Sequence, residues 1–320
     1  MKILVTGAAG FLGSRLIKML LSGTDQVPNV DTIIAADLNR CAIDDDRIDV
    51  RTGSIADPPY VRGIVDDDVD AVVHLAAVLS GQSENEFDLG LKINVDATRD
   101  LLEVCRALER RTPRFIFSSS LAVFGGDLPE IVPPDMVLTP ESSYGTGKAV
   151  AELLLNEYTR RGFIDGIVCR LPTITVRAGT PNAAASSFVS GIIREPMNGE
   201  ESVCPVPLDT RLWISSPGTA IENLAHAVGM DATPIGLRRS LNLPGLTVTP
   251  RQMLDSLERI GGEKARRLVR HQEDERIKNI VCSWPGAFDV QRALALGFRR
   301  DAGFDDVVRQ YVDELGREAA

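Results

Sequence analysis

Short apolar runs alternate with longer segments of helical spacing through the first half of the chain. The strands that this pattern predicts are Lys2–Val5, Thr32–Ala35, Ile48–Arg51, Asp70–His74, Arg114–Ser118 and Gly166–Arg170. The predicted helices between them are Phe11–Leu21, Pro58–Val65, Glu84–Arg110 and Ser143–Arg161. Several strands are continuously apolar, as expected where both faces of a parallel sheet are buried. The alternation predicts an α/β fold with a doubly wound parallel sheet.

The second half of the chain has a different pattern. From Leu171 onward proline, glycine, serine and asparagine become frequent, a composition typical of ordered loops around short elements. Helical spacing returns at Thr219–Gly229, Thr249–Ile260 and Phe304–Leu315. Residues 1–170 are therefore expected to form the sheet domain and residues 171–320 a smaller, loop-rich region. Some of the later segments are expected to pack back onto the sheet.

Composition narrows the possible partners and compartment. The 320 residues carry a formal net charge of -10, which argues against nucleic acid or an anionic membrane as the main partner. The first apolar stretch, MKILV, is too short for a signal peptide, and no stretch approaches the roughly 20 apolar residues of a membrane span. The five cysteines are scattered and contain no CxxC pair, so we expect reduced thiols and a cytoplasmic protein.

A glycine-rich segment follows the first predicted strand. It reads GAAGFLG, with Gly7, Gly10 and Gly13 as the glycines and Phe11 and Leu12 between the last two. Glycines at these positions allow a tight turn and close backbone approach to a pyrophosphate, which the amino terminus of the next helix then faces. An ordinary glycine turn is the alternative. The order strand, loop, helix at the start of a βαβ series favours dinucleotide binding and a Rossmann-type domain.

An acidic residue ends the second predicted strand. Asp37 lies 24 residues beyond Gly13, where a carboxylate can bind both hydroxyls of an adenosine ribose and repel a 2′-phosphate. A solvated aspartate at a strand end is the alternative, and the nearby Arg40 could favour the phosphorylated cofactor. On balance Asp37 favours NAD over NADP.

Further segments are compatible with the same cofactor. Ser54 and Ile55 follow the third strand, where the adenine is expected, and the small residues Leu75, Ala76 and Ala77 follow the fourth. His74 is interpreted as a structural residue. The three histidines show no metal-ligand spacing, so no metal site is predicted.

Tyr144 and Lys148 are spaced i, i+4 on a predicted helix and so share one face of it. Taken alone, they could be mere neighbours on a helix surface. The preceding strand, however, runs into Ser118–Ser120, and ligands of such sheets bind at the carboxyl ends of the strands. Oxidation of an alcohol by hydride transfer requires a base for the hydroxyl proton. A free tyrosine, with a pKa of about 10, is a weak base at neutral pH, but a nearby ammonium group and a nicotinamide cation are expected to lower that pKa.

These motifs together resemble the extended short-chain dehydrogenase/reductase family of the NAD-dependent epimerase/dehydratase type. GAAGFLG, Asp37, HLAA, SSSLAVFG, YGTGK and the LPT segment occur in the expected order over nearly the whole chain. The resemblance implies that Ser120 orients the substrate oxygen, that Tyr144 is the base, and that Lys148 lowers its pKa and holds the nicotinamide ribose. It places Asn94 beside the active site and cofactor. It places Pro172, Thr173 and Ile174 at the nicotinamide carboxamide.

The substrate is predicted from departures within this family. Nucleotide-sugar enzymes of the family carry an acidic segment where this chain has RLWISSPGTA, which weakens an epimerase interpretation. The run RLPTITVRAGTPNAAASSFVSGIIREP resembles a branch that oxidises C2 of D-erythronate, a four-carbon sugar acid, with NAD. A small acid requires a cation for its carboxylate. The candidate substrate residues are Ser80, Arg177, Asn182, Ser186 and Arg211, the two arginines being equally compatible with structural ion pairs.

Two other functions stay open from the sequence. One is a nucleotide-sugar 4-epimerase or dehydratase using the same serine, tyrosine and lysine. The other is a non-catalytic NAD-binding sensor, although such proteins commonly lose the tyrosine or lysine. The resemblance also implies a homodimer formed through the helices Glu84–Arg110 and Ser143–Arg161.

Overall fold

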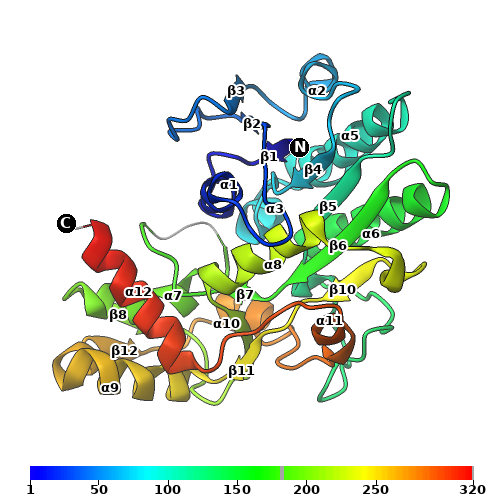
Figure 1. Ribbon diagram of the computed structural model, residues 1–320. Helices are drawn as coiled ribbons and strands as arrows, with labels where there is room; N and C mark the ends of the chain where they lie inside the picture. Colours follow the sequence, from blue (N-terminus) through cyan, green and yellow to red (C-terminus); the bar gives the residue numbers. More distant parts are fainter. Residues whose placement is uncertain (181–183, 319–320) are drawn as a thin grey trace.

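A parallel sheet forms the centre of the protein (Figure 1). The structure is a computed structural model that describes residues 1–180 and 184–318. Within these residues the sheet has seven strands in the order β10-β6-β5-β4-β1-β2-β3, and every neighbouring pair is parallel. The strands are β1 (Lys2–Thr6), β2 (Thr32–Asp37), β3 (Ile48–Thr52), β4 (Ala71–His74), β5 (Arg114–Ser120), β6 (Asp165–Leu171) and β10 (Ser240–Asn242). The predicted doubly wound parallel sheet is confirmed.

Helices cover both faces of this sheet, which explains its continuous apolar strands. Ile3 and Val5 of β1 pack into one hydrophobic cluster with helices α1 (Phe11–Ser22) and α8 (Pro217–Gly229). Leu4 points the other way, into a cluster with the three helices of the opposite face. Those helices are α2 (Pro58–Ile64), α5 (Ala97–Arg106) and α6 (Ser143–Arg160). Alternate residues of one strand thus serve two separate cores.

The predicted helix Glu84–Arg110 is wrong as a single element. The structure divides the region into α3 (Ser80–Asn85), α4 (Phe87–Leu91), a π-helical turn η1 (Lys92–Asp96) and α5. Glu86, with φ -128° and ψ 70°, leaves the helical region and separates α3 from α4. A π-helical turn is a wider coil that rarely forms without a specific packing reason. Here it coincides with Asn94, whose buried amide makes contacts outside the helix.

The remaining elements beyond residue 171 build a second layer with a core of its own. Its helices are α7 (Ser187–Met197), α9 (Pro250–Arg267), α10 (Glu275–Val281) and α12 (Phe304–Glu318), with α11 (Gln291–Ala295) nearer the main sheet. Its short strands are β7 (Thr173–Ile174), β8 (Ser202–Cys204), β9 (Leu212–Ser215), β11 (Leu246–Val248) and β12 (Val269–His271). The pattern predicted none of these strands, since two to four residues give no readable period. Figure 1 shows α7, α9 and α12 gathered at one end of the molecule.

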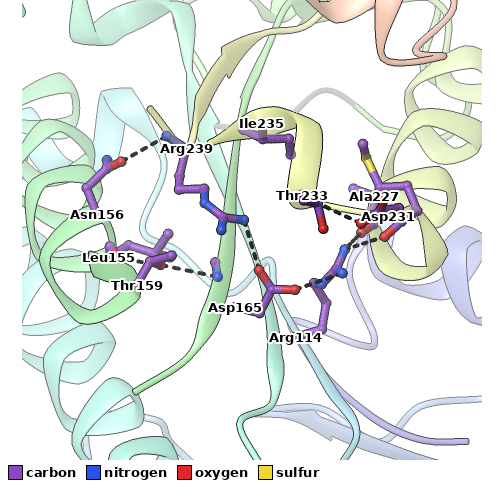
Figure 2. A network of polar contacts seen from close by, with 12 residues as sticks. Arg114, Leu155, Asn156, Thr159, Asp165, Ala227, Asp231, Thr233, Ile235 and Arg239 are labelled. Carbon is purple, nitrogen blue, oxygen red and sulfur yellow. Dashed lines mark hydrogen bonds and ion pairs between the residues drawn. The ribbon is translucent and has the colours of Figure 1, made fainter. Parts of the chain in front are cut away.

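A charged network fastens the later part of the chain to the sheet (Figure 2). Asp165, the first residue of β6, pairs with Arg114 of β5 at 2.8 Å and with Arg239, just before β10, at 2.9 Å. Arg114 also donates to the carbonyl oxygens of Ala227 and Met230, at the carboxyl end of α8. A cation there complements the helix dipole. The network lies at the amino-terminal edge of these strands, opposite the edge that carries the candidate site.

Candidate active site

A cavity of about 770 Å³ opens at the carboxyl ends of the central strands. Most of the predicted site residues line it, although they come from segments far apart in the chain. They are Gly7, Gly10, Phe11, Leu12, Gly13, Asp37, Ser54, Ile55, Leu75, Ala76, Ala77, Ser80, Ser120, Tyr144, Lys148, Pro172, Thr173, Ile174, Arg177 and Ser186. The fold therefore brings the dinucleotide-binding motifs and the serine, tyrosine and lysine to one cavity.

The glycine turn leaves no room for side chains. Gly7 has φ +73°, and a Cβ there would lie 2.8 Å from the Ala76 nitrogen. A Cβ on Gly13 would lie 2.1 Å from the Gly7 carbonyl oxygen, so α1 begins in direct contact with the end of β1. No side chain of the described residues caps the first turn of α1. The backbone N–H groups of this helix end thus face the cavity, as the pyrophosphate of a dinucleotide requires.

Asp37 stands at the edge of this cradle. One carboxylate oxygen accepts a hydrogen bond from the Ala9 N–H at 3.1 Å and the other from the Asn39 N–H at 3.0 Å. Both bonds fix the orientation of the carboxylate while leaving lone pairs for a ribose. Arg40, the alternative that would favour a phosphorylated cofactor, is exposed and is not among the residues that line the cavity.

Local packing explains how α6 presents Tyr144 and Lys148. Ser142 caps the helix by accepting a hydrogen bond from the Gly145 N–H at 3.1 Å. A Cβ on Gly145 would lie only 2.0 Å from the Ala122 carbonyl oxygen. This glycine lets the first turn of α6 pack directly against the segment that follows Ser120. The small residues of YGTGK are therefore spacers that bring a phenol and an ammonium group to the end of β5.

Lys148 is almost fully buried, with 2% of its surface exposed. Its Nζ donates to the Ser118 carbonyl oxygen at 2.7 Å and lies 4.6 Å from the centre of the Phe117 ring. The centre of the Tyr144 ring is 5.7 Å from the same nitrogen. The lysine thus bridges α6 and β5 beside the phenol.

Burial decides the proton affinities of this pair. It raises the pKa of Tyr144 to about 12, an effect that the Ser120 hydroxyl partly offsets by hydrogen bonding. It lowers the pKa of Lys148 to about 7, against the opposing effect of the Glu152 carboxylate. The expected lowering of the Tyr144 pKa concerned the complex with a nicotinamide cation, and it stays a prediction. In the protein without cofactor, burial disfavours the charged form of each group, which raises the pKa of the phenol and lowers that of the ammonium group.

Asn94 does not line the cavity. Its side-chain oxygen accepts from the Val78 N–H at 2.9 Å, and its amide nitrogen donates to the Val78 carbonyl oxygen at 3.0 Å. Asn94 therefore fixes the segment after β4 that forms one wall of the cavity. His74 is equally structural, because both its ring nitrogens bond to threonine hydroxyls.

The candidate substrate residues separate into three groups. Arg177 lines the cavity, with its backbone held by Ser190 and by Arg194, whose guanidinium donates to the Arg177 carbonyl oxygen at 3.0 Å. Burial and the Arg194 charge lower the pKa of Arg177. Arg211 is not brought to the cavity, because it is partly exposed and pairs with Glu130 at 3.0 Å. Asn182 lies outside the described residues.

Sequence reasoning missed several residues of the cavity wall. Trp284, Lys92 and Gln82 line it. Lys92 shares the turn η1 with Asn94, so its neighbourhood could have suggested it. Trp284 comes from the loop after α10, about a hundred residues beyond Arg177 in the chain, and no local motif marks it.

The SSP segment that departs from the family pattern also lies away from the cavity wall. Ser216 caps α8, and the buried Asp301 carboxylate accepts hydrogen bonds from Ser215, Ser216 and Thr219. A carboxylate thus reaches this helix end from a distant part of the chain. The departure therefore concerns the packing of α8, and the three residues of the SSP segment are not among those that line the cavity.

Comparison with known proteins identifies the family. Residues 3–216 match the profile of the NAD dependent epimerase/dehydratase family. The chain is 48% identical over 322 aligned residues to a D-erythronate dehydrogenase of Cupriavidus necator, covering 99% of each chain. It is 45% identical to a D-erythronate dehydrogenase of Haemophilus influenzae, covering 98% of this chain and 99% of the relative.

The chain belongs to the NAD dependent epimerase/dehydratase family.

Solved structures agree with this assignment. A structure described as a nucleoside-diphosphate-sugar epimerase of Agrobacterium tumefaciens is 40% identical, with a TM-score of 0.93. The alignment covers 99% of this chain and 95% of the epimerase chain. An L-threonine dehydrogenase of Clostridium difficile, 22% identical with a TM-score of 0.86, shares the fold. The family resemblance inferred from the motifs is confirmed, as are an enzymatic function and NAD as cofactor.

The described residues lack two other kinds of feature. Among residues 1–180 and 184–318, no helix combines the length and apolar character needed to cross a bilayer. The same part of the chain contains no group of three or more histidine, cysteine or acidic residues placed to hold a metal ion.

Proposed function

We propose that this protein is an NAD-dependent dehydrogenase that oxidises the C2 hydroxyl of D-erythronate to the 2-oxo acid. The main support for this substrate is the full-length similarity, at 48% and 45% identity, to two relatives named D-erythronate dehydrogenase. The cavity supports the chemistry, because a serine, a tyrosine and a lysine converge on its wall beside the glycine turn. The reaction is alcohol oxidation by transfer of one hydride and release of one proton.

NAD, when bound, supplies the hydride acceptor for C2. The glycine turn holds its pyrophosphate, and Asp37 binds its adenosine ribose. Tyr144 takes the proton of the C2 hydroxyl, and Ser120 donates a hydrogen bond to the same oxygen. Without substrate the Ser120 hydroxyl bonds to Tyr144 and lowers its pKa, and because a hydroxyl has one proton to donate, the substrate oxygen takes over this bond.

The proton affinities of Tyr144 and Lys148 set the pH at which this step runs. With pKa values of about 12 for Tyr144 and about 7 for Lys148, the pair releases its first proton near neutrality. A positive charge beside the phenol favours its ionised form, so Lys148 assists only while it holds its proton. The activity is therefore expected to depend on the shared protonation of the pair.

Arg177 is the proposed partner of the substrate carboxylate. It is the arginine that lines the cavity among the candidates, and a guanidinium binds a carboxylate through two parallel hydrogen bonds. Ser80 and Ser186 supply polar lining nearby. The hydroxyls of a small sugar acid match such donors and acceptors.

A nucleotide-sugar epimerase is the second candidate, because the 40% identical Agrobacterium tumefaciens structure carries that description. The same three side chains would then oxidise a ring carbon, and NAD would be regenerated within one turnover. The two reactions differ in whether free NADH accumulates.

The test is to incubate the purified protein with NAD and, separately, D-erythronate, its C2 epimer and UDP-glucose. We expect NADH absorbance to grow with D-erythronate and not with the nucleotide sugar. Isomerised nucleotide sugar without NADH from any four-carbon acid would refute the proposal. Tyr144→Phe is the control. Undiminished NADH formation in this variant would mean that another group is the base.

The exposed face of α6 supports a homodimer as a further part of this proposal. Leu153 is 67% exposed and Val150 36% exposed on this helix, and Phe87 of the adjacent α4 is 56% exposed. Exposed apolar side chains on two neighbouring helices are favourably covered by a second copy. Light scattering is expected to give twice the chain mass, and Leu153→Glu is expected to halve the measured mass.

A cytoplasmic location is consistent with five free cysteines, four of them buried.

A further inference from the structure

A buried ion pair lies directly behind the catalytic lysine. Glu152 follows Lys148 by one turn of α6 and is only 1% exposed. Its carboxylate accepts two hydrogen bonds from the Arg170 guanidinium, Nη2 at 2.7 Å and Nε at 3.0 Å, and a third from the Ser119 hydroxyl. Arg170 belongs to β6 and is 7% exposed. Three elements, α6, β5 and β6, therefore meet at one carboxylate.

The far side of Arg170 is fixed as well. Its Nη1 donates to the Asn242 side-chain oxygen of β10 at 3.1 Å, and its guanidinium carbon lies 4.9 Å from the centre of the Phe124 ring. A guanidinium with this many partners holds a single orientation. The Glu152 carboxylate is thus a fixed negative charge rather than a mobile one.

Titratable groups face Lys148 from three of the elements packed around it. They are Tyr144 and Glu152 on α6, the neutral His74 on β4, whose pKa is lowered to about 3, and Arg170 on β6. The side of β5 nearest the ammonium group contributes a carbonyl oxygen and an aromatic ring. Among the described residues, Glu152 is thus the carboxylate whose charge raises the pKa of Lys148.

We infer that Glu152 is a positioning residue for the reaction, which holds Lys148 in its charged form and fixes the end of β5 that carries Ser120. This inference rests on the proposed function of the same site. Two bonds join α6 to consecutive residues of β5: Lys148 to the Ser118 carbonyl oxygen, and Ser119 to Glu152. The next residue is Ser120, so both bonds restrict where its hydroxyl lies. The same carboxylate opposes the effect of burial on the Lys148 ammonium group.

A purely structural ion pair would have different consequences. Asp165 provides the comparison, because it too forms ion pairs, with Arg114 of β5 and with Arg239 beside β10, but at the opposite ends of the strands. Loss of either pair is expected to lower stability. Of the two carboxylates, only Glu152 lies within one helical turn of Lys148, so only its loss is expected to change the proton affinity of that lysine.

The first measurement uses the protein without cofactor or substrate. The chain has six lysines, Lys2, Lys18, Lys92, Lys148, Lys264 and Lys278, so a ¹⁵N spectrum of the lysine side chains is simple enough to assign. We expect Lys148 to titrate near pH 7 in the native protein and about one to two pH units lower in Glu152→Gln, the scale for removing one partly screened unit charge at this distance. Asp165→Asn is the matched control and is expected to leave that titration unchanged.

The second measurement is the pH dependence of D-erythronate oxidation. We expect the acid limb of kcat/KM to move to lower pH in Glu152→Gln and kcat to fall about 10- to 100-fold, with smaller changes in KM. Glu152→Asp keeps the charge and is expected to restore the position of the limb. If the native protein does not oxidise D-erythronate, the proposed function fails, whereas the lysine titration still tests Glu152 independently.

A second variant covers the case in which Glu152→Gln does not fold. Glu152→Gln combined with Arg170→Met removes both charges and leaves no unpaired buried cation. We expect a smaller shift of the Lys148 titration in the same direction. If Lys148 titrates at the native pH in every folded variant that lacks Glu152, the inference is wrong.

Discussion

His74 provides a quantitative test of how burial governs this protein. The residue ends β4 and is 1% exposed. The Thr98 hydroxyl donates to the Asn94 carbonyl oxygen, so it accepts from His74 Nε2 at 3.0 Å, and the Thr6 hydroxyl then donates to Nδ1 at 2.7 Å. This pattern assigns a neutral ring with its proton on Nε2. Burial, with a smaller contribution from the Lys148 charge, lowers the pKa of His74 to about 3.

The sign of the pH effect follows from this pKa. An unfolded histidine has a pKa of about 6.5 and takes up a proton below that pH, whereas the folded ring stays neutral down to about pH 3. The unfolded state thus binds more protons between these values, and stability falls as the pH is lowered. At about 1.4 kcal/mol per unit of pKa difference, His74 alone is expected to cost roughly 2 kcal/mol of unfolding free energy between pH 7 and pH 5.

The perturbation is His74→Asn, which keeps a polar side chain but does not titrate. At pH 7 this variant is expected to be less stable than the native protein by about 1–3 kcal/mol, because one threonine hydroxyl loses its partner. Urea unfolding of both proteins at pH 7, 6 and 5, followed by tryptophan fluorescence, gives the difference at each pH. That difference is expected to shrink by roughly 2 kcal/mol on going to pH 5. Parallel losses in the two proteins, with a constant difference, would show that protonation of His74 is not the cause.

Three further predictions concern the site. Tyr144→Phe is expected to lower kcat by about 10²–10⁴-fold while NAD still binds. The control is Tyr158→Phe on the outer part of α6, where the hydroxyl bonds to Glu103, and it is expected to leave kcat within about twofold. Equal losses of kcat in steady-state assays of the two variants would contradict the assignment of Tyr144 as the base. Asp37→Ala is expected to weaken NAD binding by about 10- to 100-fold and to reduce discrimination against NADP, as measured by titration with both cofactors, and an unchanged preference would exclude Asp37 as its source. Gly13→Ala places a Cβ 2.1 Å from the Gly7 carbonyl oxygen and is expected to abolish measurable NAD binding, whereas Gly63→Ala, with nothing within 4 Å, leaves binding intact and changes stability by less than about 1 kcal/mol.

Local patterns in the sequence were sufficient for the sheet and for the side of the cavity that carries Tyr144 and Lys148. Apolar runs marked five of the seven strands because buried parallel strands are apolar on both faces, whereas the predicted edge strand β3 has a mixed sequence and is partly exposed. The glycine turn, Asp37 and the Tyr144–Lys148 pair could be found because each requirement is local. A tight turn needs glycine, a strand end needs the right side chain, and a shared helix face needs a spacing of four. Their roles in the reaction are still predictions.

Contacts between distant segments decided the rest. Trp284 reaches the cavity from a loop near the end of the chain, Arg211 turns to Glu130 instead of the cavity, and Asp301 supplies the carboxylate at α8. No local period or spacing encodes such contacts. The pKa values of Tyr144 and Lys148 also could not be read from their spacing, which suggested mutual attraction of charges. Desolvation depends on how many atoms the whole fold places around a group, and only the tertiary structure determines that number.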